Sequence, residues 1–161
     1  MGNCLRSGKI EKRDICKKEL KDINPKKVAS FPWQNECLDC YVYKVYDGDT
    51  VKVLFYYNDL LFKYSIRIIG IDTPELLRCS TLEKQAGIKV KYYLKNLIEH
   101  KMVKIYCFNF DKYGARLDGN IYYNGTNISE ELVNKKYAKL YDGKSKKEEW
   151  SKEDLEYILN N

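Results

Sequence analysis

The hydrophobic and polar positions follow no regular period over the first quarter of the chain. Before residue 41 no apolar repeat is sustained, and Pro25 and Pro32 interrupt the pattern, which favours a flexible tail over residues 1–40. From Tyr41 onward, short runs of β-branched and aromatic residues alternate with turn residues, and this pattern predicts strands. The expected strands are residues 41–46, 51–57, 60–69, 102–107 and 116–123.

Apolar residues at helical spacing predict three helices. A long one is expected after Ser80 and Glu83, which form a capping box before apolar positions that recur from Leu82 to Leu97. Two shorter helices are expected further on, the first capped by Ser129 and the second beginning with a capping box of Ser145 and Glu148.

The order of these elements indicates the architecture. Five short strands with one long helix after the third are typical of a small closed barrel. The predicted fold is therefore mainly β with α, a five-stranded OB-fold barrel with about three helices, and it is expected to occupy residues 41–161.

The positive charge is concentrated in the tail. The net charge is +6, and residues 1–30 carry nine basic and four acidic side chains, so nearly all of the excess lies there. A basic tail on a nearly neutral body favours a surface partner, either an anionic membrane or a nucleic acid. The alternative is a solvated, disordered tail that binds no partner.

The first residues, Met1-Gly2-Asn3-Cys4, resemble a lipidation signal. Gly2 would accept a myristoyl chain and Cys4 a palmitoyl chain, and two such signals are what a stable anchor needs. Arg6 stands where the motif expects Ser or Thr. The expected location is intracellular, at the cytoplasmic face of a membrane if the tail is acylated.

Composition removes several kinds of chemistry. No apolar run approaches the ~18 residues of a membrane span, and no secretory signal is recognised. His100 is the single histidine, which excludes HExxH metalloproteases and multi-His metal sites. Cys37 and Cys40 form one CxxC pair without a second pair nearby, so a coincidence is favoured over a zinc or redox site.

Two acidic motifs flank the predicted hairpin. Asp49 follows the first strand and Asp72 follows the third, and folding the chain back near residues 58–59 places Asp49 roughly opposite residue 68. Arg67 would then lie between the two carboxylates. Converging carboxylates suit a hard divalent cation, and an adjacent guanidinium binds phosphate oxygens. The set favours phosphodiester hydrolysis, although each motif alone is most often a turn.

Four stretches carry a family resemblance: VYDGDTVK at Val45–Lys52, IRIIGIDTPE at Ile66–Glu75, FDKYG at Phe110–Gly114 and AKLYDG at Ala138–Gly143. With them the chain resembles the staphylococcal-nuclease-like (thermonuclease) domains over about residues 41–150. The resemblance implies an OB barrel with three helices, in agreement with the order of elements above.

The resemblance also implies a role for each matching residue. Asp49 and Asp72 would bind Ca²⁺ together with the carbonyl oxygen of Thr73. Glu75 would be the general base or orient the attacking water, and Arg67 would bind the scissile phosphate. The residues expected along the nucleotide are Lys112, Tyr113 and Tyr141.

One position departs from the family pattern. The family has an arginine directly after Asp-Lys-Tyr-Gly, whereas here Ala115 follows Gly114 and Arg116 comes next. A turn absorbs an extra residue readily, so Arg116 is predicted to be the second catalytic arginine. In a regular strand the same insertion would turn its side chain to the opposite face.

Two functions follow as hypotheses. The first is a Ca²⁺-dependent endonuclease that acts on DNA and RNA with low sequence specificity and leaves 3′-phosphate ends, as the resemblance implies. The second is an OB-fold module that binds nucleic acid or a protein with little or no catalysis, which the Ala115 departure motivates. Nothing in the sequence argues for more than a monomer.

Overall fold

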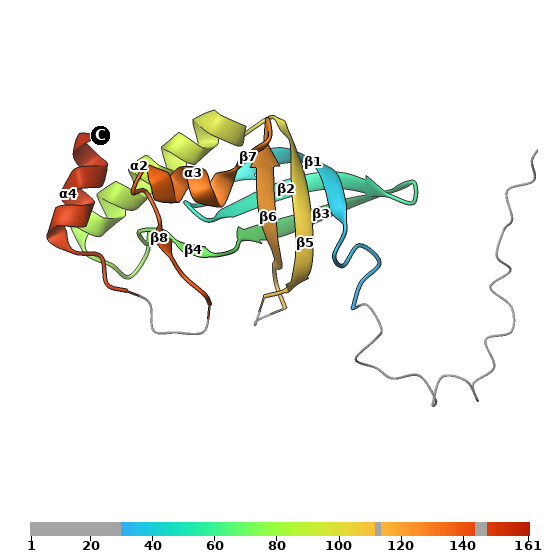
Figure 1. Ribbon diagram of the computed structural model, residues 1–161, viewed down its shortest axis with the longest axis horizontal. Helices are drawn as coiled ribbons and strands as arrows, with labels where there is room; N and C mark the ends of the chain where they lie inside the picture. Colours follow the sequence, from blue (N-terminus) through green and yellow to red (C-terminus); the bar gives the residue numbers. More distant parts are fainter. Residues whose placement is uncertain (1–29, 112–113, 144–147) are drawn as a thin grey trace, which may run out of the picture. The chain divides into compact units, whose positions relative to one another are not determined.

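The alternation of apolar and polar side chains produces five long strands that follow one another around a sheet (Figure 1). The structure, a computed structural model, describes residues 30–111, 114–143 and 148–161. The β-branched and aromatic residues in these runs suit a pleated, half-buried surface. The long strands are β1 (Cys37–Val45), β2 (Thr50–Tyr57), β3 (Leu60–Ile68), β5 (Met102–Phe110) and β6 (Leu117–Tyr123).

The sheet closes on itself into a barrel. Neighbouring strands run antiparallel in the order β3, β2, β1, β5 and β6, with the short strand β7 (Thr126–Asn127) beyond them. A parallel pairing of β3 with β6, in which Ile66 faces Leu117, joins the two ends. Both of these residues are fully buried, as is Val51 on β2. The predicted OB-type barrel, mainly β with α, is confirmed.

A second, two-stranded sheet follows the barrel. The chain leaves β3 through Gly70, whose φ of +81° favours glycine, and enters β4 (Ile71–Asp72). This strand pairs with β8 (Lys139–Leu140), so that Asp72 faces Lys139. The DTPE segment is thereby attached to the C-terminal part of the chain.

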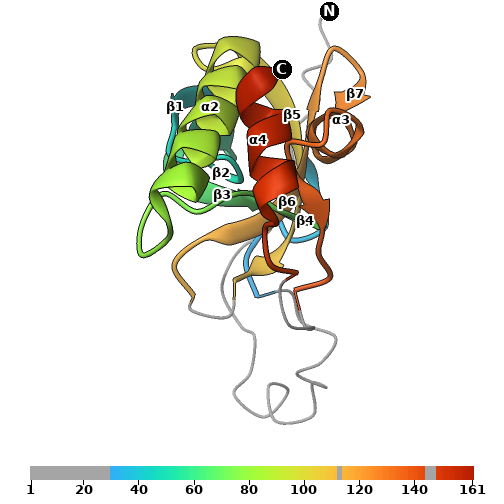
Figure 2. The same ribbon diagram turned by 90° about the vertical axis from the view of Figure 1, so that its left-hand side faces the viewer.

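The long helix α2 (Thr81–Ile98) begins where the sequence predicts. The side chain of Ser80 accepts a hydrogen bond from the backbone N–H of Glu83, and the apolar face of the helix is buried. Figure 2 shows α4 (Lys152–Asn160) beside α2. Lys89 donates a hydrogen bond to the carbonyl of Leu159 across this contact, at 2.9 Å.

The caps of the two short helices differ from the prediction. Asn127, and not Ser129, is the N-cap of α3 (Ile128–Asn134), because its side chain accepts from the Ser129 N–H at 2.9 Å. Helix α4 begins at a capping box of Ser151 and Asp154. The expected box at Ser145 and Glu148 was therefore placed too early, and Ser145 lies outside the described residues.

The folded unit begins ten residues earlier than the predicted boundary. It spans Phe31–Asn161, because Phe31 and Trp33 are buried and β1 already starts at Cys37. Trp33 packs edge-on against Phe55 with ring centroids 5.3 Å apart, and it also contacts Phe62. The boundary at residue 41 was wrong because isolated aromatic residues beside Pro32 produce no periodic signal.

The CxxC pair lies within a regular strand. Cys37 is exposed and Cys40 is buried, so the two thiols lie on opposite faces of β1. Three residue steps along a strand separate their Cα atoms by about 10 Å, which is beyond the reach of a disulfide. This geometry argues against a redox disulfide between Cys37 and Cys40. Within the described ranges, no helix is long and apolar enough to cross a membrane.

Candidate active site

The β2–β3 hairpin brings Asp49 and Arg67 together. Thr50 faces Arg67 in the register, and the N–H of Ile68 donates to the carbonyl of Asp49 at 2.8 Å. This is the pairing that the hairpin spacing predicts. Arg67 Nη1 lies 3.3 Å from Asp49 Oδ2, so the guanidinium and the carboxylate form an ion pair at the barrel end.

The carboxylate of Asp49 is buried beside that of Asp47. Burial raises its pKa to about 6, Arg67 and the hydroxyl of Thr50 oppose this shift, and the neighbouring Asp47 adds to it. Thr50 Oγ1 donates to Asp49 Oδ1 at 2.9 Å. A carboxylate in this position is stabilised by additional positive charge.

The two acidic motifs are in close contact at Gly48. A Cβ atom built there would lie 2.6 Å from Thr73 Oγ1, which leaves no room for a side chain. Asp72 and Thr73 are buried, whereas Glu75 is exposed. The backbone N–H of Glu75 donates to Glu83 Oε1 at 3.1 Å, so the first turn of α2 holds the segment that presents this carboxylate.

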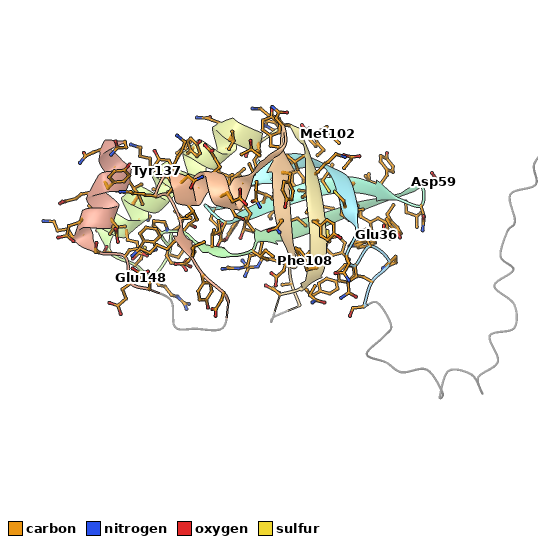
Figure 3. The ribbon with its side chains drawn as sticks, viewed as in Figure 1. Glu36, Asp59, Met102, Phe108, Tyr137 and Glu148 are labelled. Atoms are coloured by element: carbon orange, nitrogen blue, oxygen red, sulfur yellow. The ribbon has the colours of Figure 1, made fainter. Side chains whose placement is uncertain are left out.

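A pocket of about 210 Å³ opens at this end of the barrel. Charged and hydroxyl side chains from both motifs surround it, joined by an arginine from the β5–β6 turn. An adjoining pocket of about 350 Å³ shares Glu75 and contains Asp72 and Glu148, and Figure 3 shows Glu148 beside the start of α4. The first pocket is lined by Asp47, Asp49, Arg67, Thr73, Pro74, Glu75, Leu76 and Arg116.

Arg116 reaches the pocket although Ala115 lengthens the motif. Its Nη1 atom lies 3.3 Å from Thr50 Oγ1, and its Nε atom lies 2.9 Å from Asp111 Oδ2. The backbone N–H groups of Ala115 and Arg116 both donate to Asp111 Oδ1. The side chain of Arg116 therefore lines the same pocket as Arg67, and its role as the second catalytic arginine stays a prediction.

Asp111 holds this turn. Burial opposes ionisation of its carboxyl, but hydrogen bonds from Arg116 and from the Ala115 backbone lower its pKa below the ordinary value. This role of Asp111 was not predicted from the sequence. The available signal was its position five residues before Arg116, on the other side of a predicted turn. The carboxylate thus orients the arginine.

Asp118 is a second acidic residue that sequence reasoning missed. It faces Arg67 in the parallel β3–β6 register, and burial raises its pKa although Arg67 opposes the shift. Tyr141 lines a small pocket of about 100 Å³ together with both of these residues. The N–H of Tyr141 donates to the carbonyl of Gly70 at 3.0 Å.

The other predicted residues lie outside the described part of the chain: Lys112 and Tyr113 of the proposed nucleotide contacts, and Gly2 and Cys4 of the proposed lipidation site.

The donor set of the pocket suits a hard cation. Asp47, Asp49 and Glu75 offer carboxylate oxygens, and Thr73 offers a hydroxyl and a carbonyl oxygen, which are the ligands that Ca²⁺ accepts. Among the described residues, no group of three or more His, Cys, Asp or Glu side chains is close enough to hold a metal by itself. A cation here would therefore complete its coordination with backbone oxygens and water.

Comparison with known proteins identifies the family. The family model described as "Staphylococcal nuclease homologue" matches residues 65–160. An Escherichia coli protein named "Uncharacterized endonuclease" is 30% identical over 115 residues, which are 70% of this chain and 68% of that protein. The chain therefore belongs to the staphylococcal nuclease homologue family, a family of nucleases.

Further relatives are longer proteins. The rice (Oryza sativa subsp. japonica) protein named "Probable staphylococcal-like nuclease CAN2" is 36% identical over 94 residues, which are 56% of this chain and 24% of that protein. The Schizosaccharomyces japonicus protein named "Probable endonuclease lcl3" is 31% identical over 85 residues, 49% of this chain and 36% of that protein. The chain spans about a quarter of the length of the rice relative.

Proposed function

We propose that this protein is a Ca²⁺-dependent endonuclease that hydrolyses DNA and RNA phosphodiesters with low sequence specificity and leaves 3′-phosphate ends. One observation carries the proposal. Arg67 and Arg116 come from distant parts of the sequence and line the same pocket as Asp49 and Glu75. Two guanidinium groups beside two carboxylates match the charges of phosphodiester hydrolysis, in which an anionic phosphate is attacked by an activated water.

The two arginines would bind the phosphate and stabilise the charge that grows on it. A guanidinium presents a planar fork of donors that fits phosphate oxygens. Arg116 is oriented by Asp111 through its Nε atom, which leaves its terminal nitrogens on the side of Thr50. This orientation requires no rearrangement when the phosphate arrives, so it favours the transition state.

Glu75 would take a proton from the attacking water or hold that water in place. Its side chain is exposed and lines both the first pocket and the adjoining one. Because Glu83 holds the backbone of Glu75, the carboxylate projects from a fixed segment. A general base needs this access to solvent together with a defined position.

The ion-binding residues would be Asp49 and the carbonyl of Thr73, which belong to the first pocket, together with Asp72, which lines the adjoining pocket. Ca²⁺, when bound, supplies positive charge that stabilises the phosphorane-like transition state. Lys112, Tyr113 and Tyr141 would lie along the nucleotide, where they would bind phosphate and pack on sugar or base.

A cleavage assay tests the proposal. Single-stranded DNA, double-stranded DNA and RNA are incubated with Ca²⁺, with Mg²⁺ or with a chelator, and the new ends are analysed for 3′-phosphate. We expect Ca²⁺-dependent cleavage of all three substrates. The binding-module alternative predicts instead that folded protein binds the oligonucleotides without Ca²⁺ and cuts none of them.

We also propose that Gly2 and Cys4 are acylated and hold the protein at the cytoplasmic face of a membrane. The support is the Met-Gly-Asn-Cys start and the basic residues that follow it. Changing Gly2→Ala should move the protein from the membrane fraction to the soluble fraction. Unchanged fractionation of this variant would contradict the idea.

A further inference from the structure

Another depression, of about 620 Å³, adjoins the catalytic pocket along α2. Leu76 lines both of them, so the two cavities meet at this residue. Figure 2 shows α4 on one flank of α2 and β1 on the other. Residues of both β1 and α2 line the depression. We call it the α2 groove, and the residues that carry the argument are Tyr43, Lys44, Leu76, Lys84, Lys91 and Tyr92.

The groove follows one face of the helix. Lys84, Ile88, Lys91 and Lys95 are spaced by three or four residues, which places them in a row on one side of α2. Lys95 comes eleven residue steps after Lys84, which corresponds to about 16 Å along the helix axis. The row therefore extends along the helix away from the catalytic pocket, which suits an elongated ligand better than a small one.

The groove carries unneutralised positive charge. Lys95 pairs with Glu99 at 3.3 Å, which offsets one charge. Lys44, Lys84 and Lys91 form no ion pair with any residue in the described ranges, although all three line the groove. An occupant of complementary charge is therefore anionic.

The same groove exposes aromatic and aliphatic surface. Tyr92 is 58% exposed and Leu77 is 71% exposed, and Tyr43 lies across from them on β1. Lysines beside aromatic rings suit a single nucleic-acid strand, whose unstacked bases pack on the rings while its phosphates contact the cations. In a duplex the bases are stacked inside, so this apolar surface would have no partner.

The geometry points to the α2 groove as the binding path for single-stranded DNA or RNA beyond the scissile phosphate. The strand passes Leu76 between the catalytic pocket and the groove. This inference rests on the proposed nuclease function, because that function places a phosphodiester in the adjoining pocket.

The test compares a long and a minimal substrate. In the double variant Lys84→Ala/Lys91→Ala, kcat/KM for a twelve-nucleotide single strand should fall about tenfold. For a chromogenic phosphodiester of one nucleotide, which does not reach the groove, kcat/KM should stay within about twofold. The matched control is Lys63→Ala/Lys104→Ala, which removes the same charge from β3 and β5 outside the groove.

A binding measurement with chelator present tests the groove without any cleavage. The log–log dependence of oligonucleotide affinity on salt should become shallower by about 1.4 in the double variant, since each lost phosphate contact removes about 0.7 for a single strand. Tyr92→Ala should weaken binding at least about fivefold through lost base stacking. Folding of each variant is checked by its thermal midpoint.

Three results for the Lys84→Ala/Lys91→Ala variant would overturn the inference. The first is an equal loss of kcat/KM on both substrates, and the second is a salt dependence of oligonucleotide affinity identical to that of the control variant. The third is that the variant keeps its oligonucleotide affinity but no longer binds phosphatidylserine vesicles that the wild type binds, which would assign the groove to a membrane surface. The failure of the proposed function is distinguishable. If the wild type cleaves nothing, the nuclease assignment fails, and the salt dependence alone decides whether the groove binds a strand.

Discussion

Asp111 and Arg116 are joined by three hydrogen bonds across the β5–β6 turn. The guanidinium Nε lies 2.9 Å from Asp111 Oδ2, the N–H of Arg116 donates to Asp111 Oδ1 at 3.3 Å, and the N–H of Asp111 donates to the carbonyl of Arg116 at 2.7 Å. The N–H of Ala115 also donates to Asp111 Oδ1, at 3.0 Å. These bonds fix Ala115 and Arg116 relative to Asp111. They also keep the arginine beside Thr50 and Arg67, where a phosphate would bind.

Substitution of Asp111 should therefore impair both stability and activity. Asp111→Asn removes the charge that faces Arg116, in a site where the carboxylate is only 5% exposed. We expect a loss of about 1.5–3 kcal/mol in the free energy of unfolding, because the half-buried guanidinium of Arg116 loses its hydrogen bond to a charged partner. Activity should fall at least about tenfold, as judged by kcat/KM on single-stranded DNA.

The control for this variant is Asp39→Asn, which breaks an exposed pair with Lys104 on the barrel surface. Exposed pairs contribute little, so stability should change by less than about 1 kcal/mol and activity should not change. Equal effects of the two substitutions would show that Asp111 has no special role.

Gly87 should be needed for activity more than for stability. A Cβ atom there would lie 2.6 Å from the carbonyl oxygen of Pro74 and 3.1 Å from that of Glu75. Gly87→Ala gains about 1 kcal/mol of helix propensity but pushes the Glu75 segment away from α2. We predict that kcat falls about tenfold or more, with KM within about twofold and a nearly unchanged thermal midpoint.

Gln85→Ala, on the exposed face of the same helix, is the matched control and should leave kcat unchanged. A Gly87→Ala enzyme with wild-type kcat would mean that the position of the Glu75 backbone does not limit catalysis.

Glu99 should contribute stability that depends on pH. Burial opposes ionisation of Glu99, but the Val45 N–H at 2.7 Å and Lys95 lower its pKa below the ordinary 4.5. Because the pKa is lower in the folded state, the contribution is present above pH 4.5 and is lost as the pH falls through the folded-state value. It should be on the order of 1 kcal/mol.

Urea denaturation of the wild type and of Glu99→Gln between pH 3 and 7 measures this contribution. The stability difference between the two proteins should be largest near pH 7 and should shrink below about pH 4.5. A difference that is independent of pH would contradict the assignment.

The N-terminal boundary can be tested by truncation. A protein that starts at Ser30 keeps Phe31 and Trp33, which are buried, and should unfold cooperatively. A protein that starts at Tyr41 loses both aromatic residues and half of β1, and should be unfolded because a buried tryptophan alone contributes about 3–5 kcal/mol. Thermal unfolding followed by circular dichroism shows whether each truncated protein is folded. A stable protein starting at Tyr41 would support the later boundary.

The sequence predicted those features that depend on local patterns. The turn near residues 58–59 set the register of the hairpin, and this register was sufficient to place Asp49 beside Arg67. Contacts that depend on closure of the barrel could not be predicted from local patterns, because the parallel pairing that brings Asp118 to Arg67 joins residues about fifty positions apart. The α2 groove also needs the packed arrangement of α2 and β1.

Competing local signals explain the errors. Both Ser129 and Asn127 are good N-cap residues, and only the backbone conformation decides that Asn127 takes the position. The pairs Ser145 with Glu148 and Ser151 with Asp154 have the same spacing. Trp33 was missed because its partners lie on β2 and β3, more than twenty residues away.

The most direct measurement is kcat/KM for cleavage of single-stranded DNA, with Ca²⁺ and with chelator, by the wild type, Arg116→Ala and Arg116→Lys. The account predicts Ca²⁺-dependent cleavage by the wild type and a loss of about 10²–10³-fold in Arg116→Ala. Arg116→Lys should recover little, because an ammonium lacks the planar fork. Wild-type activity in Arg116→Ala, or no cleavage by folded wild-type protein, would contradict the account.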